Sequence, residues 1–281
     1  MKSGFIAIIG RSNVGKSSIL NSLIGTKVSI VTNRAQTTRL PVQGILNDAR
    51  GQAVFVDTPG LLHETHDRLT KKLNDVISQV IQEIDLILYV VDPTRAIGNE
   101  EYSLLKLVEN IPTAKKILVI NKADLKEQPF KYEYQGLASK FGQVLEISAY
   151  NNRGLEALKD LVFEALPEGE ILFPDGQFTT LDNRVWLSEL IREKVFYYLH
   201  DELPYGIKIN VLDVTEEEGL LKIDARIVTN DENHKGMIIG LKGRKIKEIG
   251  TAARKELEAI LGQKVFLKLE VEVDPDWQRL F

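Results

Sequence analysis

Near its start, the chain carries a glycine-rich stretch with the residue types needed to bind phosphate. An apolar run at 5–9 leads into Gly10-Arg11-Ser12-Asn13-Val14-Gly15-Lys16-Ser17, and a helical pattern follows. Glycines allow close backbone approach, and the loop N–H groups with the next helix N-terminus bind anionic oxygens. Lys16 would then reach the β- and γ-phosphates of a nucleotide, and the Ser17 hydroxyl would ligate Mg²⁺. The alternative is a glycine-containing turn that matches the pattern by chance.

A second motif, Asp57-Thr58-Pro59-Gly60, ends the apolar run 52–57. An aspartate that leaves a strand beside a phosphate-binding loop can hold Mg²⁺ through water, and the Gly60 N–H can bind a γ-phosphate. Leu61 follows, and a leucine cannot orient water by hydrogen bonding. Catalytic help must therefore come from another group, from backbone or from an additional ion.

Between these two motifs lies a polar, irregular segment, 30–40. Thr38, or its neighbour Thr37, could complete the Mg²⁺ shell when a γ-phosphate is present, and such segments order and disorder with nucleotide state. A passive loop is the alternative. The residues of these motifs to which we assign catalysis are Lys16, Thr38 and Gly60.

Two further strand ends indicate which base the nucleotide carries. Asn121-Lys122-Ala123-Asp124 follows the apolar run 116–120, and Ser148-Ala149 follows 143–147. The Asp124 carboxylate can accept from both N1–H and the exocyclic amine of guanine, a donor pair that adenine lacks. Asn121 would tie this loop to the phosphate-binding loop, the Lys122 stem would cover a face of the base, and a backbone N–H at 148–149 would reach guanine O6.

These motifs require strands that all end at one edge of a sheet. Strand-like runs alternate with amphipathic helical stretches, which predicts an α/β domain with a mostly parallel sheet and helices on both faces. The short link between two of the runs favours an antiparallel hairpin there. The predicted strands are 5–9, 42–47, 52–57, 86–91, 116–120 and 143–147, and a last helix covers 154–165.

The second part of the chain has a different pattern. Pro and Gly between 167 and 176 predict a linker, and an apolar stripe at helical spacing begins after 181. Two strands (207–214 and 220–228) precede Gly240-Leu241-Lys242-Gly243, which lies before a helix at 244–261 and a strand at 265–273. This order matches the type II KH module, an α+β fold whose GXXG loop clamps nucleotide backbone. The candidate RNA-binding residues are Lys235, Gly240, Leu241, Lys242, Gly243, Arg244, Lys245, Lys247 and Arg254.

On these motifs the chain resembles the translation-factor-related GTPases and, within them, the Era family. The resemblance implies a G domain at 1–167, a linker at 168–180 and a KH domain at 181–281. It also implies GTP hydrolysis, GTP/GDP and Mg²⁺ as ligands, and assembly of the small ribosomal subunit through the 3′ end of 16S rRNA. Ser12 departs from the proline common in Era proteins, but every phosphate ligand stays in place.

The same resemblance gives Asn13 two possible roles. It stands where related GTPases carry an asparagine that coordinates a monovalent cation, so K⁺ could compensate for Leu61. Alternatively, Asn13 bonds its own backbone as an ordinary loop residue. Two other functions are possible. The chain could be a related GTPase of tRNA modification or large-subunit assembly, or it could be an RNA-binding module with little or no intrinsic hydrolysis.

Composition sets the remaining limits. The 281 residues suffice for two domains, the net charge of −4 confines nucleic-acid binding to a local patch, and the absence of cysteine excludes thiol and Cys-ligated chemistry. No signal peptide or membrane-spanning run is visible. We expect a cytoplasmic monomer that binds RNA and no DNA; peripheral association with the inner face of the cell membrane is known in the family.

Overall fold

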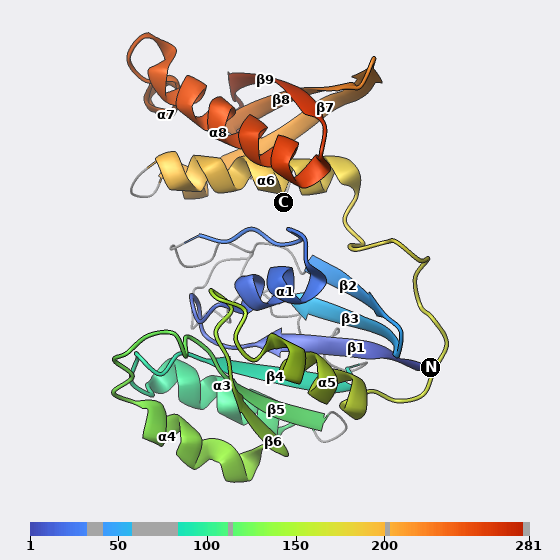
Figure 1. Ribbon diagram of the computed structural model, residues 1–281. Helices are drawn as coiled ribbons and strands as arrows, with labels where there is room; N and C mark the ends of the chain where they lie inside the picture. The colour runs from blue at the N-terminus through green and yellow to red at the C-terminus, as the bar shows by residue number, and fades with distance from the viewer. Residues whose placement is uncertain (33–41, 58–83, 112–114, 200–202, 278–281) are drawn as a thin grey trace. The chain divides into compact units, whose positions relative to one another are not determined.

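The computed structural model describes the chain as two compact units, Met1–Thr180 and Leu181–Phe281 (Figure 1). Among the residues described, no helix is long and apolar enough to cross a membrane. The described residues are 1–32, 42–57, 84–111, 115–199 and 203–277.

The first unit is built on a six-stranded sheet with the strand order β2-β3-β1-β4-β5-β6. Strand β1 pairs in parallel with β3 and β4, whereas β2 forms an antiparallel hairpin with β3. The predicted fold, including the hairpin, is therefore confirmed. The strands are β1 (Lys2–Ile9), β2 (Val42–Asp48), β3 (Gly51–Asp57), β4 (Leu86–Val91), β5 (Lys115–Ile120) and β6 (Gln143–Glu146).

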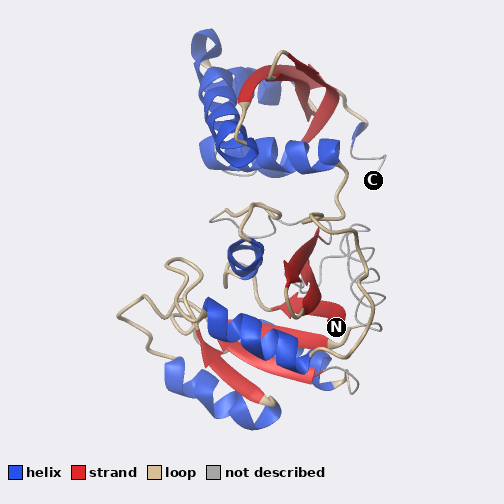
Figure 2. Cartoon of the chain, turned by 45° about the vertical axis from the view of Figure 1, so that its right-hand side comes forward, coloured by secondary structure: helices blue, strands red, loops and turns tan. Residues whose placement is uncertain are grey.

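Helices cover both faces of this sheet (Figure 2). Because successive strand residues point to opposite faces, a strand covered on both sides must be apolar throughout, and every residue of β4 is buried. Helices α1 and α5 pack on one face, and α3 and α4 on the other. The helices are α1 (Lys16–Ile24), α3 (Asn99–Glu109), α4 (Lys131–Gln135) and α5 (Leu155–Ala165), with a short 3-10 helix, η1 (Gly136–Lys140), after α4.

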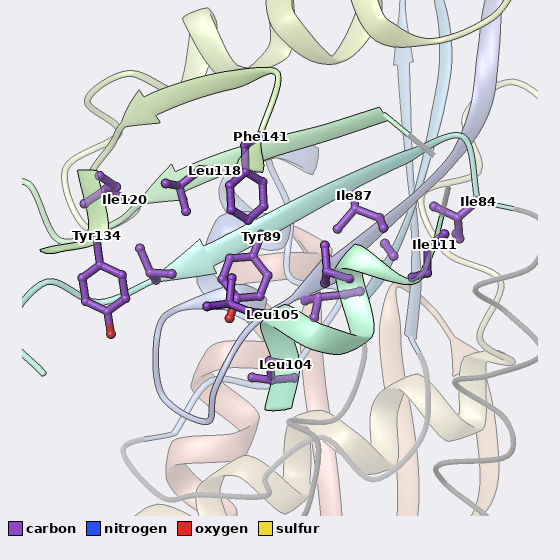
Figure 3. Close-up of a cluster of buried hydrophobic side chains, with 14 of the residues drawn as sticks. Ile84, Ile87, Tyr89, Leu104, Leu105, Ile111, Leu118, Ile120, Tyr134 and Phe141 are labelled. Atoms are coloured by element: carbon purple, nitrogen blue, oxygen red, sulfur yellow. The ribbon is translucent and has the colours of Figure 1, made fainter. Parts of the chain in front are cut away.

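A cluster of buried side chains fills the layer between the sheet and α3 (Figure 3). Aliphatic residues of β1, β4 and β5 meet Leu104, Leu105 and Val108 of α3. Two tyrosines, Tyr89 and Tyr134, lie in the same cluster and are at most 1% exposed. A buried tyrosine needs a partner for its hydroxyl group, so this layer must also contain polar contacts.

The second unit places three helices against a three-stranded sheet with the order β7-β8-β9, in which β8 and β9 are parallel. The predicted helical stripe is buried at Trp186, Leu190 and Val195, whereas Tyr198 is half-buried. The elements are α6 (Asn183–Tyr198), η2 (Leu203–Gly206), β7 (Ile207–Glu217), β8 (Leu220–Thr229), α7 (Glu232–Ile239), η3 (Leu241–Gly243), α8 (Arg244–Leu261) and β9 (Lys264–Val273).

Residues 168–180, which the sequence predicts to be a linker, lie along the sheet of the first unit. We call them the connecting segment. The Thr179 hydroxyl donates to the Gln43 carbonyl oxygen (2.8 Å), and the Ile45 N–H donates to the Phe178 carbonyl oxygen (2.9 Å). Gln52, fully buried, accepts from the N–H groups of residues 172 and 173. This segment therefore follows the edge strand β2 instead of running free.

Candidate nucleotide and RNA sites

The phosphate-binding loop begins where β1 ends and continues into α1, as the motif predicts. Two of its glycines are required by close approach. A Cβ at Gly10 would lie 2.2 Å from the Val90 carbonyl oxygen, and one at Gly15 would lie 2.2 Å from Nδ2 of Asn121. Gly15 also adopts φ 101°, in the left-handed region. At these two positions the loop backbone is thus packed against the ends of two other strands, with no room for a side chain.

Lys16 is buried inside the curve of this loop, at 7% exposure. Its Nζ donates to the carbonyl oxygens of Gly10 (2.9 Å) and Arg11 (2.8 Å). Burial lowers the pKa of Lys16 from its ordinary value, and the negative charge of Asp57 counteracts this only in part. Since burial penalises its charged form, the ammonium group gains from an anionic ligand placed at the loop.

Asp57, at the end of β3, shows how a divalent cation would fit. Its Oδ2 accepts hydrogen bonds from the hydroxyls of Ser17 (2.6 Å) and Ser29 (2.8 Å). Its Oδ1 is buried and has no hydrogen-bond partner among the described residues. Burial raises the pKa of Asp57, while Lys16 and the two hydroxyls act in the opposite direction. A buried acceptor oxygen beside the Ser17 hydroxyl fits a hard, water-bearing cation such as Mg²⁺.

The candidate base site joins three segments of chain. Asn121 Nδ2 donates to the Val14 carbonyl oxygen (2.8 Å), which is the predicted tie to the phosphate-binding loop. Its Oδ1 accepts from the Ala149 N–H (3.1 Å), so a guanine O6 would have to share that donor. The exposed Asp124 carboxylate accepts from the Ser148 hydroxyl at 2.5 Å. These bonds fix Asp124 at the mouth of the site with its remaining oxygen open to a ligand.

Lys122 has a partner that the sequence analysis missed. It adopts φ 62°, and its Nζ contacts Oδ2 of the buried Asp92 at 2.5 Å. Burial acts to raise the pKa of Asp92, but hydrogen bonds from Lys122 and Thr94 hold this pKa below its ordinary value. The signal was available, since Asp92 directly follows the strand 86–91 and thus ends at the same sheet edge as the motifs. Asp92 orients the lysine stem that is predicted to cover the base.

Arg11 and Ser12 use their backbone, not their side chains, in the loop. The Arg11 guanidinium points away toward α3, with Nε donating to Glu100 (2.9 Å) and Nη1 to the Ala96 carbonyl oxygen (3.0 Å). The Ser12 carbonyl oxygen accepts from Nη1 of Arg95 at 2.8 Å. Asn13 is exposed and adopts φ 62°. Any contribution of Arg11 to a nucleotide would therefore come from its main chain.

Part of the predicted site falls outside the described residues. These positions are Thr37, Thr38, Thr58, Pro59, Gly60 and Leu61. Within the described part of the chain, no group of three or more His, Cys, Asp or Glu residues could hold a metal ion by itself.

In the second unit, the Gly240–Gly243 loop joins α7 to α8. Gly240 has φ 71° and ψ 175°, and Gly243 has φ 74° and ψ 12°. Between them, Leu241 is 85% exposed and Lys242 adopts φ 50°. A loop of this shape exposes its backbone at the start of a helix, as a clamp on a nucleotide backbone requires.

The predicted basic patch is only partly neutralised. Arg244 and Lys245 share Glu248, at 3.0 and 3.6 Å. Two more basic residues of the patch also have acidic partners: Lys235 pairs with Glu232 (3.5 Å) and Arg254 with Glu258 (3.1 Å). Lys242 and Lys247 are exposed and show no ion pair within the described chain. The free positive charge therefore concentrates at the loop and the first turns of α8.

Family models divide the chain in the same way. Residues 5–122 match the model described as a 50S ribosome-binding GTPase, and residues 202–278 match the KH domain model. The two models match the chain in the order GTPase and then KH domain, which agrees with the two sites described above.

Whole-chain relatives share both units. The chain is 41% identical to GTPase Era of Geobacter metallireducens and 43% identical to GTPase Era of Trichlorobacter lovleyi, in each case over 98% of this chain and 94% of the relative. It also matches two solved structures with a TM-score of 0.90 and 36% identity, over 99% of this chain and 96% of theirs. One is an Aquifex aeolicus Era variant bound to GDP·AlF4⁻, and the other is Era with MgGDPNP and nucleotides 1506–1542 of 16S ribosomal RNA.

Proposed function

The chain belongs to the Era family of GTPases, and we propose that it couples the GTP cycle of its first unit to capture of 16S rRNA by its second. The observation that carries this proposal is the convergence of Lys16, Asp57 and Asp124 at one sheet edge. The same chain presents a GXXG loop, and Lys242 of that loop and Lys247 of α8 form no ion pair with the described residues. Assembly of the small ribosomal subunit is the process that such a pairing would serve.

The reaction of the first unit is the hydrolysis of GTP to GDP and phosphate. The loop N–H groups and Lys16 bind the β- and γ-phosphates, so that the negative charge that develops on them is stabilised by fixed donors. When bound, Mg²⁺ supplies additional positive charge at the phosphates. Ser17 and Thr38 are proposed to hold it directly, and Asp57 through water, an assignment that the unpartnered Oδ1 of Asp57 supports. Asn121, Lys122 and Asp124 are proposed to select guanine.

The RNA assignment rests on the second unit and on one relative. The solved Era complex with nucleotides 1506–1542 of 16S rRNA supports a 3′-terminal rRNA segment as the ligand. The KH match at residues 202–278 favours this family over GTPases of tRNA modification or large-subunit assembly, which resemble only the first unit. Gly240–Gly243 would clamp the RNA backbone, and Lys242, Lys247 and Arg244 would neutralise its phosphates.

Turnover assays test the enzymatic part. The wild-type chain is expected to release phosphate from GTP with Mg²⁺, and Lys16→Ala is expected to abolish the release. Absence of phosphate release in both KCl and NaCl would instead identify a binding module whose nucleotide is a structural ligand.

The same assay decides the role of Asn13. We propose that K⁺ bound near Asn13 supplies the charge that Leu61 cannot. Turnover should then be faster in KCl than in NaCl, and Asn13→Ala should remove that difference while GDP still binds. Equal rates in the two salts would exclude the cation.

RNA binding is tested with paired substitutions. Replacing Lys242 and Arg244 with alanine should weaken binding of a 16S 3′-end fragment and flatten its salt dependence, with GTPase activity retained. The matched control removes two cations from the sheet of the same unit, Lys222 and Lys268, which form ion pairs with Glu217 and Asp224. Equal losses in the two variants would mean that only net charge matters.

Coupling requires that GTP and GDP differ in their effect on RNA. The affinity for the fragment is to be measured with a GTP analogue and with GDP, because a ligand without differential binding shifts no equilibrium. Equal affinities would leave two independent binding activities in one chain.

A further inference from the structure

A carboxylate lies buried beneath the phosphate-binding loop, and neither the motifs nor the proposed function accounts for it. Glu101, in the first turn of α3, has a side chain that is 1% exposed. The Tyr89 hydroxyl donates to its Oε1, and the Tyr134 hydroxyl lies 3.2 Å from its Oε2. Both rings belong to the hydrophobic cluster, and in Figure 3 the hydroxyl groups of both rings point toward the bottom of the view. Burial raises the pKa of Glu101, against the two hydroxyl contacts.

Two contacts connect this carboxylate to the loop. Oε2 of Glu101 lies 3.9 Å from Nη1 of Arg11, whose Nε pairs with Glu100 at 2.9 Å. The Tyr134 hydroxyl also lies 3.1 Å from the Arg95 carbonyl oxygen, and Arg95 donates to the Ser12 carbonyl oxygen. Glu101 and its tyrosines therefore reach two consecutive loop residues. They reach Arg11 through its guanidinium, and they reach Ser12 through Arg95, whose carbonyl oxygen faces Tyr134 and whose guanidinium donates to Ser12.

The loop residue that Glu101 reaches is also the one that holds Lys16. The Arg11 carbonyl oxygen accepts from Lys16 Nζ at 2.8 Å, and the Arg11 guanidinium is only 14% exposed. Stability alone does not explain the arrangement, because an apolar side chain of similar volume often stabilises a core as well as a buried ion pair does. A fixed guanidinium instead restricts the backbone that orients the lysine.

We propose that Glu101 is a positioning residue for the nucleotide site, which acts through Arg11 to fix the first half of the phosphate-binding loop before the nucleotide binds. The proposal rests on the proposed function of this loop. Tyr89 and Tyr134 hold the carboxylate, the carboxylate and Glu100 hold Arg11, and Arg11 holds the carbonyl group that faces Lys16. Preorganisation of this kind lowers the ordering that the ligand itself must drive.

The test is Glu101→Gln, with Glu109→Gln as its matched control. The two changes are identical in chemistry and lie on the same helix, but Glu109 pairs with Lys140 at the surface (2.7 Å). Glu101→Gln should weaken the affinity for GDP–Mg²⁺ and raise KM for GTP by about tenfold, the order expected for one lost charge-assisted contact, while kcat per titrated active site changes less. Glu109→Gln should leave the dissociation constant, KM and kcat as in the wild type.

A second comparison separates positioning from folding. In an Arg11→Met background, Glu101→Gln should have little additional effect on GDP affinity, because the contact through which it acts is already gone. Should Glu101→Gln not fold, Tyr134→Phe removes one hydroxyl from the carboxylate and should shift KM in the same direction by a smaller factor. A lowered Tm with unchanged KM and GDP affinity, or full additivity with Arg11→Met, would overturn the proposal. A wild-type chain that does not bind GTP would instead refute the proposed function.

Discussion

At the scale of single residues, the base selection that we propose depends on how Asp124 is held. Its Oδ1 is occupied by the Ser148 hydroxyl, which leaves the other oxygen and the remaining lone pairs for the base. The Ser148 hydroxyl is a neutral donor, so this contact brings no positive charge to the Asp124 carboxylate. Such an acceptor suits two neighbouring N–H donors, which guanine provides.

We predict that Asp124→Asn exchanges the base preference. The amide keeps one acceptor for N1–H but turns the other into a donor, which matches the carbonyl group at C2 of xanthine. GTP affinity should fall by roughly a hundredfold, and XTP should become the better ligand. Competition binding with GDP and XDP measures this.

Ser148→Ala is the control for that experiment. It removes the hydroxyl that orients Asp124 but leaves the donor and acceptor pattern intact. It should weaken both nucleotides to a similar degree. An unchanged guanine preference in Asp124→Asn would remove this residue from the base site.

Sequence motifs mark the residues that we propose to meet a ligand and do not mark those that hold them in place. Lys16, Asp57 and Asp124 are recognisable because ligand chemistry fixes their type and spacing. Glu101 acts through tertiary contacts with residues far along the chain, and no local pattern marks it. Asp92 is intermediate, since its place after a strand was visible but its pairing with Lys122 was not.

At the scale of elements, the GXXG loop shows two glycines with different requirements. Gly243 has a left-handed helical backbone, which other residues adopt at a cost of about 1 kcal/mol. Gly240 has ψ 175°, a region that is nearly exclusive to glycine, and its Cβ would lie 2.7 Å from Cβ of Lys245. The first glycine is therefore fixed by the fold, and the second more by access to the ligand.

We predict that Gly240→Ala destabilises the second unit by about 3 kcal/mol and Gly243→Ala by about 1 kcal/mol. Denaturant unfolding followed by tryptophan fluorescence can measure the difference. Both tryptophans of the chain, Trp186 and Trp277, are buried in the second unit and report on it alone. Equal destabilisation by the two alanines would contradict the assignment.

The strands were predicted well because apolar runs between charged stretches leave little choice of boundary. One exception is β7, which continues to Glu217 and not to residue 214, because its end pairs with the start of β8. The other is β1, which begins at Lys2 and not at residue 5, because Lys2–Gly4 pair with Gly51–Ala53 of β3. That extension depends on a partner strand, which composition at 2–4 does not reveal. The contacts of the connecting segment were difficult to predict for the same reason. Its Pro and Gly content is typical of a linker, but its backbone bonds to β2.

At the scale of the whole molecule, the two compact units should unfold in separate transitions. GDP–Mg²⁺ at about a hundred times its dissociation constant should stabilise the first unit by about 2.7 kcal/mol. The fluorescence transition, which reports on the second unit, should stay in place, while the circular dichroism signal of both units separates into two steps.

Lys16→Ala should remove the GDP-induced shift without changing the fluorescence transition. A nucleotide-dependent shift of the fluorescence transition equal to that of the first unit would show that the units unfold as one. In that case the base and phosphate contacts would contribute directly to the stability of the RNA-binding unit.

The connecting segment also determines how few residues separate the bonded ends of the two units. Thr179 is bonded to β2, and Asp182 caps α6 by accepting from the Arg184 N–H. Only Thr180 and Leu181 lie between these two anchored residues. The effective concentration at which RNA held by one unit meets the other is therefore governed by a short tether, between residues 179 and 182, and not by the full span of 168–180. Lengthening this tether would dilute one site relative to the other without altering either of them.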